Sequence, residues 1–296
     1  MICWVRNAQI LRLDQKPYLL YEHDGFGIPQ TKRIEDSGPL QHGTTDRGMK
    51  LPARDIVLYV QMFADDWADY YEKRAELARW FSPFGEAGTL QVTEAGVGGS
   101  NCRGGLEISG YAVEGLDFPG SEREGLTQTV PIVLHCSDPL WQDIESSSVT
   151  FSAGGGSDTF EVPTVVPFKV GASTMLVSQL IDYAGDADAY PVITMFGPVT
   201  DLKISIQPQG KNYSLKLDFA GTTIAAGDWY EIDLRYGVKT IKDSNGVNKI
   251  STLSANSNLA TFRLFAGASN YISMTGTGIT SSTMAQLTWK NAYGGI

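Results

Sequence analysis

The chain has 296 residues, 42% of them hydrophobic and 19% charged, which is the composition of a globular protein long enough for two domains. Its net charge of −10 argues against broad binding to nucleic-acid phosphates. It contains no apolar run of the roughly 18 residues that a membrane helix needs, and polar residues interrupt the N-terminus where a signal peptide would be apolar. We therefore expect a protein that is made in the cytoplasm, binds no nucleic acid and does not insert into a membrane.

The 3 cysteines are widely spaced and form no CxxC pair. A disulfide framework would need an even and denser set. We expect reduced thiols, with Cys136 buried beside Leu134, because free cysteine is often buried.

Short strand patterns occupy the first 25 residues, and a polar, irregular stretch follows from Gly27 to Pro52. A structureless stretch of this length inside a domain is uncommon and is usually functional or disordered. Two interpretations stay open: a mobile surface loop, or an arm that becomes ordered against a neighbouring subunit. In the second interpretation, Arg33 and Arg47 are candidate ring-interface residues that meet acidic groups of the neighbour.

An apolar strand then leads into a predicted helix over residues 65–81, "DDWADYYEKRAELARWF". Asp65 or Asp66 can cap its N-terminus, and Pro83 ends it. Apolar residues recur at three- and four-residue spacing, which predicts one stripe that packs in the core rather than a ligand site. The stripe consists of Trp67, Tyr70, Tyr71, Leu77, Ala78 and Phe81.

After the helix, strand patterns continue to Trp141, with a glycine-rich hairpin tip at 96–105. We place the domain boundary near this tryptophan, which gives domains 1–142 and 143–296. The Ser/Gly-rich stretch 145–158 is interpreted as a linker or a long turn. About eight short strands follow without a helical pattern, which is typical of a β-sandwich or jelly roll. They are expected within 159–165, 190–197, 202–208, 213–221, 228–236, 261–267, 270–276 and 285–293.

The clearest strand pattern begins at Tyr230, from which apolar and polar residues alternate as far as Val238, and the turn "DSNG" follows. Alternation places Trp229 on the polar face, together with Glu231 and Asp233. Three roles stay open for this tryptophan: it caps the edge of the core, it contacts a protein partner, or it stacks on a glycan. We expect the first, and therefore a loss of stability when the indole is removed.

The chain offers no credible active site or metal site. Its 3 histidines are scattered, without an HExxH motif, and His135 is expected in the core. Each acidic pair has a simpler explanation: a helix cap, a solvated strand face, or a loop that lacks the oxygen-ligand series of a calcium site. These pairs are Asp65/Asp66, Glu231/Asp233 and Asp186/Asp188. We predict no catalytic residue, no cofactor and no metal, and hence no enzyme.

Three pieces of sequence occur in a characteristic order: "PARDIVLYVQM" before the helix, "VPIVLHCSDPLWQ" at the end of the first half, and "GDADAYPVITMFGPVTDLKI" before "AAGDWYEIDLRYGVKTIKDSNGVN". In this order the chain resembles the distal tail protein family of long, non-contractile-tailed bacteriophages. The resemblance implies a mainly β protein, with a tail-tube-like N-terminal β-sandwich carrying one helix and a galectin-like C-terminal β-sandwich. It implies six copies in a ring, the baseplate hub, within the tail tip of the virion. The implied partners are the tail tube protein, a tail-tip protein and receptor-binding proteins.

The alternative function is a carbohydrate-binding module of the lectin-like jelly-roll type, with host-surface glycans as ligands, because an exposed aromatic ring is a common sugar platform. A glycan-cleaving enzyme is disfavoured because a pair of positioned carboxylates is missing. A ring-forming protein needs a heterologous interface that closes by rotation, whereas a free-standing lectin module does not.

Overall fold

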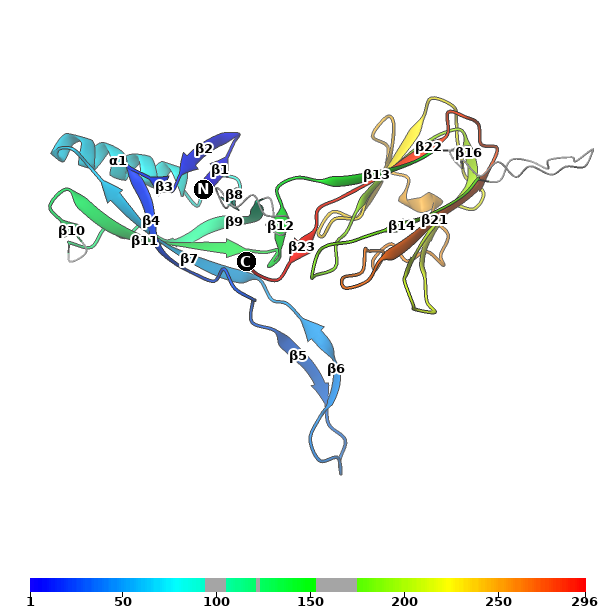
Figure 1. The fold of residues 1–296 in the computed structure, drawn as a ribbon, viewed down its shortest axis with the longest axis horizontal. Coiled ribbons are helices and arrows are strands. Elements are labelled where there is room, and N and C mark those ends of the chain that lie inside the picture. Colours follow the sequence, from blue (N-terminus) through cyan, green and yellow to red (C-terminus); the bar gives the residue numbers. More distant parts are fainter. Residues whose placement is uncertain (94–104, 121–122, 153–174) are drawn as a thin grey trace, which may run out of the picture. The chain divides into compact units, whose positions relative to one another are not determined.

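The computed structural model describes residues 1–93, 105–120, 123–152 and 175–296. It divides into two compact units, residues 1–145 with 293–296, and residues 146–292 (Figure 1). Nearly all of the hairpin tip expected at 96–105, and the strand expected at 159–165, lie outside the described residues. The predicted fold class is confirmed, because the described residues form antiparallel sheets with one α-helix.

One 11-stranded sheet forms most of the first unit, and its inward side chains join in a single core. Strands β7 and β11 run through its centre, and every second residue of each is buried because side chains alternate between the faces of a strand. In sheet order the strands are β2 (Gln9–Arg12), β1 (Ile2–Arg6), β8 (Gly88–Val92), β9 (Leu106–Gly115), β11 (Thr127–Cys136), β7 (Arg54–Phe63), β4 (Tyr18–Asp24) and β3 (Asp14–Gln15), with β10 (Arg123–Glu124), β12 (Trp141–Asp143) and β23 (Ala292–Tyr293) paired at the sides.

The alternation of side chains along β11 also tests the predictions for Cys136 and His135. Cys136 is buried at the end of β11, as predicted. The prediction for His135 was wrong: it precedes Cys136 by one residue and therefore faces the other way, half-exposed, with its Nδ1 atom 2.7 Å from Oδ1 of Asp55.

Helix α1 (Trp67–Trp80) begins where the sequence predicts. Asp66 is the N-cap, and its carboxylate accepts from the backbone N–H of Asp69 at 2.8 Å. The predicted apolar stripe is only half correct. Tyr70, Leu77 and Phe81 are buried, and Phe81 stacks on Trp4 at 5.3 Å between ring centroids.

The other three members of the stripe, Trp67, Tyr71 and Ala78, are exposed. At 100° per residue the six residues span one arc of about 120°, and Trp67, Tyr71 and Ala78 form the half of that arc that lies away from Leu77 and is left in solvent. The sequence shows the apolar stripe but not which part of it the sheet covers.

The second unit is a sandwich of two antiparallel sheets whose inner side chains form its core. One sheet has the order β13 (Ser147–Ser152), β22 (Met284–Trp289), β15 (Val192–Phe196), β19 (Trp229–Asp233), β20 (Thr240–Asp243). The other has the order β14 (Met175–Ile181), β21 (Asn270–Thr277), β16 (Val199–Pro208), β17 (Leu215–Asp218), with β18 (Thr223–Ile224) paired to β16. A 3-10 turn, η2, spans Ile250–Thr252.

Three strand assignments of the second half were wrong. The stretch 145–158, expected to be a linker or turn, contains β13 in its described part. Residues 261–267 form no strand: Phe262 and Leu264 are fully buried, but among the described residues this segment makes one isolated β-bridge, Ala189 to Leu264, and no ladder. The strand expected within 228–236 stops at Asp233, because the chain turns there towards β20.

Candidate functional site

The stretch predicted to be an irregular loop or arm is a β-hairpin. Strands β5 (Lys32–Asp36) and β6 (Thr45–Lys50) pair only with each other and form a separate two-stranded sheet (Figure 1). Every residue from 30 to 50 is exposed to solvent. A two-stranded hairpin without a packed face is at best marginally stable in water. We call residues 28–52 the arm.

The arm exposes apolar side chains that nothing in the described structure covers. Leu40 at its tip is 96% exposed and Ile28 at its root 82%, and Ile34 and Met49 are each more than half exposed. These side chains are spread from the root of the arm to its tip and form no single patch, so the exposure of the whole arm, rather than an apolar cluster, favours contact with another molecule.

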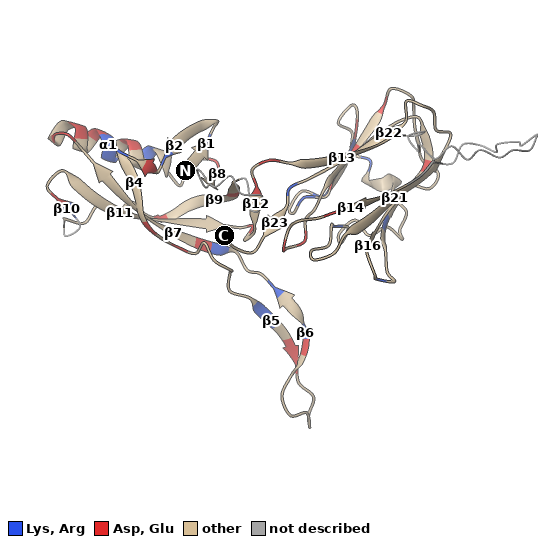
Figure 2. Cartoon of the chain, viewed as in Figure 1, with Lys and Arg blue, Asp and Glu red and all other residues tan. Residues whose placement is uncertain are grey.

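The charges of the arm are sorted along its length, with basic residues near the root and acidic residues towards the tip (Figure 2). Two directly opposite pairs carry like charges, Lys32 with Lys50 and Glu35 with Asp46. Like charges facing each other across a hairpin are destabilising. The repulsion between Glu35 and Asp46 is offset within the arm, because Arg33 pairs with Asp46.

The predicted ring-interface residues, Arg33 and Arg47, both lie on the arm. Arg33 donates to Asp46 at 2.7 Å and Arg47 donates to Asp36 at 3.0 Å, so each is paired within its own hairpin. All four side chains are more than half exposed. Such exposed ion pairs contribute only about 0–1 kcal/mol, so the arginines can exchange partners at little cost. Their role at an interface stays a prediction.

The root of the arm is fixed by Arg54, a buried side chain that the sequence patterns did not reveal. Its Nη1 atom donates to the carbonyl oxygens of Gly25 at 3.1 Å and Gly27 at 3.0 Å. Its Nη2 atom donates to the carbonyl of Gly294 at 2.5 Å. Burial lowers the pKa of Arg54 from its usual value. The sequence signal that could have revealed Arg54 is a charged residue at the first position of an apolar strand.

Glycine is required at the same root. Gly25 has a φ of +87°, and a Cβ atom there would lie 2.6 Å from the carbonyl oxygen of Asp55. The backbone N–H of Ile296 donates to the carbonyl of Phe26 at 3.2 Å. Residues 294–296 therefore contact the first segment of the root, residues 25–27, and Arg54 donates hydrogen bonds to both segments.

In the second unit, the predicted contact residue Trp229 lies half-buried on the outer face of its sheet. It stands directly opposite Phe196, which in turn stands opposite Met284. Because directly opposed residues share a face, these three side chains form a row across β19, β15 and β22. The alternation predicted for Trp229 is correct, and its partner or glycan contact stays a prediction.

Glu231 and Asp233 were expected on a solvated face of this strand, and for Asp233 this expectation was wrong. Asp233 is only 4% exposed. Arg235 donates to it from Nε at 3.0 Å and from Nη2 at 2.6 Å. Burial alone would raise the pKa of Asp233, but these bonds hold it below its usual value. The carboxylate is therefore tied in a structural ion pair.

Lys239, in the loop between β19 and β20, is another residue that the sequence patterns did not reveal. Its ammonium lies 4.0 Å from the centre of the Tyr190 ring, and Nζ is buried without a hydrogen-bond partner among the described residues. Burial, together with the nearby Arg263, lowers the pKa of Lys239 to about 8.

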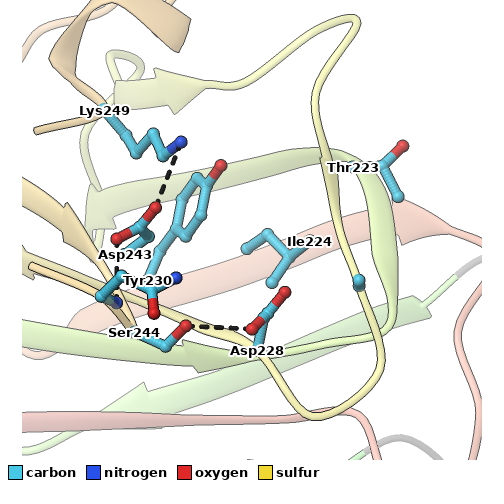
Figure 3. A pocket seen from close by; sticks show the side chains of 9 residues that line it. Thr223, Ile224, Asp228, Tyr230, Asp243, Ser244 and Lys249 are labelled. Carbon is cyan, nitrogen blue, oxygen red and sulfur yellow. Dashed lines mark hydrogen bonds and ion pairs between the residues drawn. The ribbon is translucent and has the colours of Figure 1, made fainter. Parts of the chain in front are cut away.

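A shallow polar pocket lies beside β19 and β20 (Figure 3). Its wall is the ring of Tyr230, between Ile224 and the ion pair of Asp243 with Lys249, which is 3.1 Å long. Ser244 donates to Asp228 at 2.9 Å. Its volume of about 180 Å³ is below that of ordinary ligand sites, and most of its charged groups already pair with one another. This arrangement stabilises the turn after β20.

No group of three or more His, Cys, Asp or Glu side chains is placed to hold a metal ion in the part of the chain that the structure describes. No helix within the described ranges is long and apolar enough to cross a membrane. The exposed arm is thus the feature of the described chain that most needs a partner.

Comparison with known proteins bears directly on the first unit and on the whole fold. Residues 13–90 match the family model described as phage tail protein RIFT-related domain. The crystal structure of SPP1 Dit (gp 19.1) is similar over 99% of both chains, with a TM-score of 0.64 and 13% sequence identity. The chain has the fold of a phage distal tail protein. The matched domain and the shared fold confirm the resemblance to phage distal tail proteins that was seen in the sequence.

SPP1 Dit is described as a paradigm of the hub adsorption apparatus in phages that infect Gram-positive bacteria. A second similar structure is a chain of the phage P2 baseplate in its activated conformation with Ca, with a TM-score of 0.50 and 9% identity over 98% of both chains. No curated protein sequence matches the chain.

Proposed function

We propose that the chain is a structural baseplate hub protein of a phage tail, which forms a six-membered ring between the tail tube and the tail tip. The observation that carries the proposal is the similarity to SPP1 Dit over 99% of both chains, because it includes both units and not only the matched domain at 13–90. A hub acts by presenting interfaces, so this function needs no catalytic residue.

The geometry of the arm supports the ring. A hairpin exposed at every residue from 30 to 50 and without a packed face is marginally stable alone, and it gains stability from a surface outside itself. The arm and the surface that receives it are different parts of one chain, which gives a heterologous contact, and such contacts form a ring when the rotation between neighbouring subunits closes. The arm therefore lies across an adjacent subunit. Tail tube, tail-tip and receptor-binding proteins dock on the ring.

The mass of the purified protein tests the proposal. Size-exclusion chromatography with light scattering should give a particle of about six times the 32.2 kDa of one chain, and electron microscopy should show a closed ring. A protein that stays monomeric over a hundredfold range of concentration, both alone and with its tail tube protein, would contradict the proposal.

A second candidate function, glycan binding by the second unit, is favoured by the row Trp229, Phe196 and Met284. A polar row of Glu231, Thr194 and Gln286 lies beside it in the same register. Aromatic rings can stack on sugar rings while polar groups bind hydroxyls. Binding of the chain to cell-wall polysaccharide, lost in Trp229→Ala, would support this function. Equal binding by that variant would exclude it.

A further inference from the structure

The pocket beside β19 and β20 contains a hydroxyl group that the fold does not use. The side chain of Tyr230 is 7% exposed, and its ring packs edge-to-face on the fully buried Phe219 at 6.3 Å between centroids. The hydroxyl at the end of this fixed ring has no hydrogen-bond partner among the described residues, and it opens into the pocket. A buried tyrosine usually has a hydrogen-bond partner for its hydroxyl. Here the hydroxyl is left for water or for a ligand.

Strand pairing fixes a second donor beside this hydroxyl. Tyr230 stands directly opposite Asp243 in the ladder of β19 and β20. Asp243 accepts from the backbone N–H groups of Asn245 at 3.0 Å and Val247 at 2.9 Å, and its other oxygen pairs with Lys249 at 3.1 Å. The ammonium of Lys249 therefore lies at the same end of the pocket as the Tyr230 hydroxyl (Figure 3). An ammonium has three donors, and the pair with Asp243 leaves the others for a ligand.

An acceptor lies at the other end of the pocket, where the carboxylate of Asp228 lies beside Ile224 (Figure 3). The turn before β19 places it, because the backbone N–H of Asp228 donates to the carbonyl of Ala225 at 3.2 Å and Gly227 has a φ of +88°. Ser244 donates to Oδ1 of this carboxylate at 2.9 Å, and Oδ2 has no partner among the described residues. The pocket thus combines donors at one end with an unused acceptor at the other.

The size and charge of the pocket define what it can hold. Its volume of about 180 Å³ corresponds to about six water molecules at their share of the liquid, which is room for one sugar ring and not for a longer glycan. Two carboxylates, Asp228 and Asp243, and one ammonium, Lys249, give the lining a net charge of −1, which disfavours a phosphate or an acidic sugar. A neutral sugar has hydroxyls that both donate and accept, and C–H groups that can pack on Ile224.

From the unused hydroxyl, the donor and acceptor ends and the size of the cavity, we propose that this pocket binds a single neutral monosaccharide unit of a cell-surface glycan. Tyr230 and Lys249 bind hydroxyls at one side of the sugar ring, and Asp228 accepts from a hydroxyl at the other. The ion pair that stabilises the turn also serves the ligand, because a side chain that is already fixed loses little freedom on binding. The inference goes beyond the hub function and rests on the glycan candidate, to which it adds a site distinct from the outer row of Trp229.

Saturation-transfer NMR on the full chain tests the site, with glucose, galactose, mannose and N-acetylglucosamine titrated separately and glycerol alongside. At least one sugar should receive saturation, and Tyr230→Phe should weaken its binding by about three- to tenfold, the scale of one hydrogen bond. Phenylalanine keeps the ring against Phe219 and removes no hydrogen bond within the described protein, so the melting temperature should not fall. The matched control is Tyr271→Phe, a tyrosine of β21 that is 41% exposed and lies outside the pocket; it should have no effect.

A second variant, Asp228→Asn, tests the acceptor end. Asparagine keeps the shape of the side chain and can still accept from Ser244, but it places an amide N–H where the free carboxylate oxygen was. Binding of the same sugar should weaken by about tenfold, because a charge-assisted hydrogen bond is lost. The matched control is Asp182→Asn, since Asp182 is also exposed and accepts from a serine hydroxyl, that of Ser269 at 2.7 Å, but lies outside the pocket.

The outcomes separate this site from the other proposals. Weaker binding by Tyr230→Phe and Asp228→Asn, with unchanged binding by Trp229→Ala, would support the pocket. Binding weakened by Trp229→Ala alone would overturn the pocket and leave the glycan candidate intact. Saturation of none of the four sugars, or glycerol bound as tightly as the best of them, would overturn the monosaccharide site. The mass of the assembled protein decides the hub function separately, whatever the sugars do.

Discussion

Arg54 of β7 donates to the carbonyl oxygen of Gly294, a residue 240 positions later in the chain. The same guanidinium also bonds the carbonyls of Gly25 and Gly27, so one side chain joins the root of the arm to the segment that follows the second unit. Phe26, between the two glycines, packs edge-to-face on Trp141 at 5.3 Å. The root is therefore part of the core of the first unit, whereas the arm itself is not.

Arg54→Met should destabilise the first unit by about 2–4 kcal/mol, because it leaves three carbonyl groups without their donor in a buried setting. Chemical denaturation of the full chain measures this loss. The control is Arg12→Ala, whose ion pair with Asp14 is 46% exposed on the arginine side and should contribute little to stability. Equal effects of the two changes would mean that Arg54 does not hold the root.

Deleting residues 30–48 and joining the ends with glycine and serine should abolish the ring and leave a folded monomer. Every residue from 30 to 50 is exposed, so the deletion removes no core contact. Assembly itself raises the melting temperature, so the comparison is made at a concentration at which the unaltered chain is also monomeric. There the melting temperature should stay within about 2 °C, which corresponds to about 1 kcal/mol or less for a chain of this size. Light scattering gives the mass. A ring of unchanged mass and stability after the deletion would show that the arm is not part of the interface.

Periodicity and caps predicted the helix and most central strands of the second sandwich, because those signals are local. Asp66 caps α1 as expected, and β15, β16 and β21 lie where alternation places them. The hairpin structure of the arm was missed because its strands have no buried face, and hence no hydrophobic alternation to detect.

The candidate site was only partly predictable for a related reason. Arg33 and Arg47 were identified as arm residues, but the register that opposes Lys32 with Lys50 depends on a bulge between Ile34 and Glu35. Nor does spacing tell which side of an amphipathic helix meets the sheet, so the exposure of Trp67 could not be foreseen. The return of residues 293–296 to the first unit depends on tertiary contacts through Arg54.

A fragment of residues 146–292 should fold alone and unfold in one cooperative transition. Both of its ends lie in neighbouring strands, with Ser147 directly opposite Trp289, so the cut does not open the sandwich. Urea denaturation followed by tryptophan fluorescence and by circular dichroism should give coincident curves. An aggregating product without a cooperative transition would contradict this.

A fragment of residues 1–145 should be less stable than the same unit within the full chain. Tyr293 is 4% exposed and belongs to the core of this unit, and loss of a buried aromatic side chain removes about 3–5 kcal/mol. Addition of a peptide covering 290–296 should raise its melting temperature. Equal stability with and without these residues would show that the returning segment contributes nothing.

Lys239 should make the stability of the second unit depend on pH between about 8 and 10.5. Its pKa in the folded protein is about 8, below the ordinary lysine value of 10.5, chiefly because of burial. In this window the unfolded chain holds a proton that the folded chain has released, so stability rises with pH. Below about pH 8 both states are protonated and the dependence disappears.

The comparison with Lys239→Met isolates this effect, since all other groups titrate alike in both proteins. The free energy of unfolding of the unaltered chain, minus that of the variant, should increase from pH 8 to 10.5 and stay flat from about pH 6 to 7.5. A difference that is flat throughout, or that falls with pH, would show that the amine keeps an ordinary pKa.

Trp229→Ala should destabilise the second unit by about 1–2 kcal/mol, the loss expected when a half-buried aromatic side chain is removed from a sheet face. This is less than a residue that caps the core would give, because Trp229 lies on the outer face opposite Phe196. The matched variant is Tyr230→Ala, the next residue in the strand, which is 7% exposed and faces inward; it should lose about 3–5 kcal/mol. Denaturation of the 146–292 fragment measures both. A loss for Trp229→Ala as large as that for Tyr230→Ala would place the indole in the core. An unchanged melting curve would mean that the indole contributes only to contacts with another molecule.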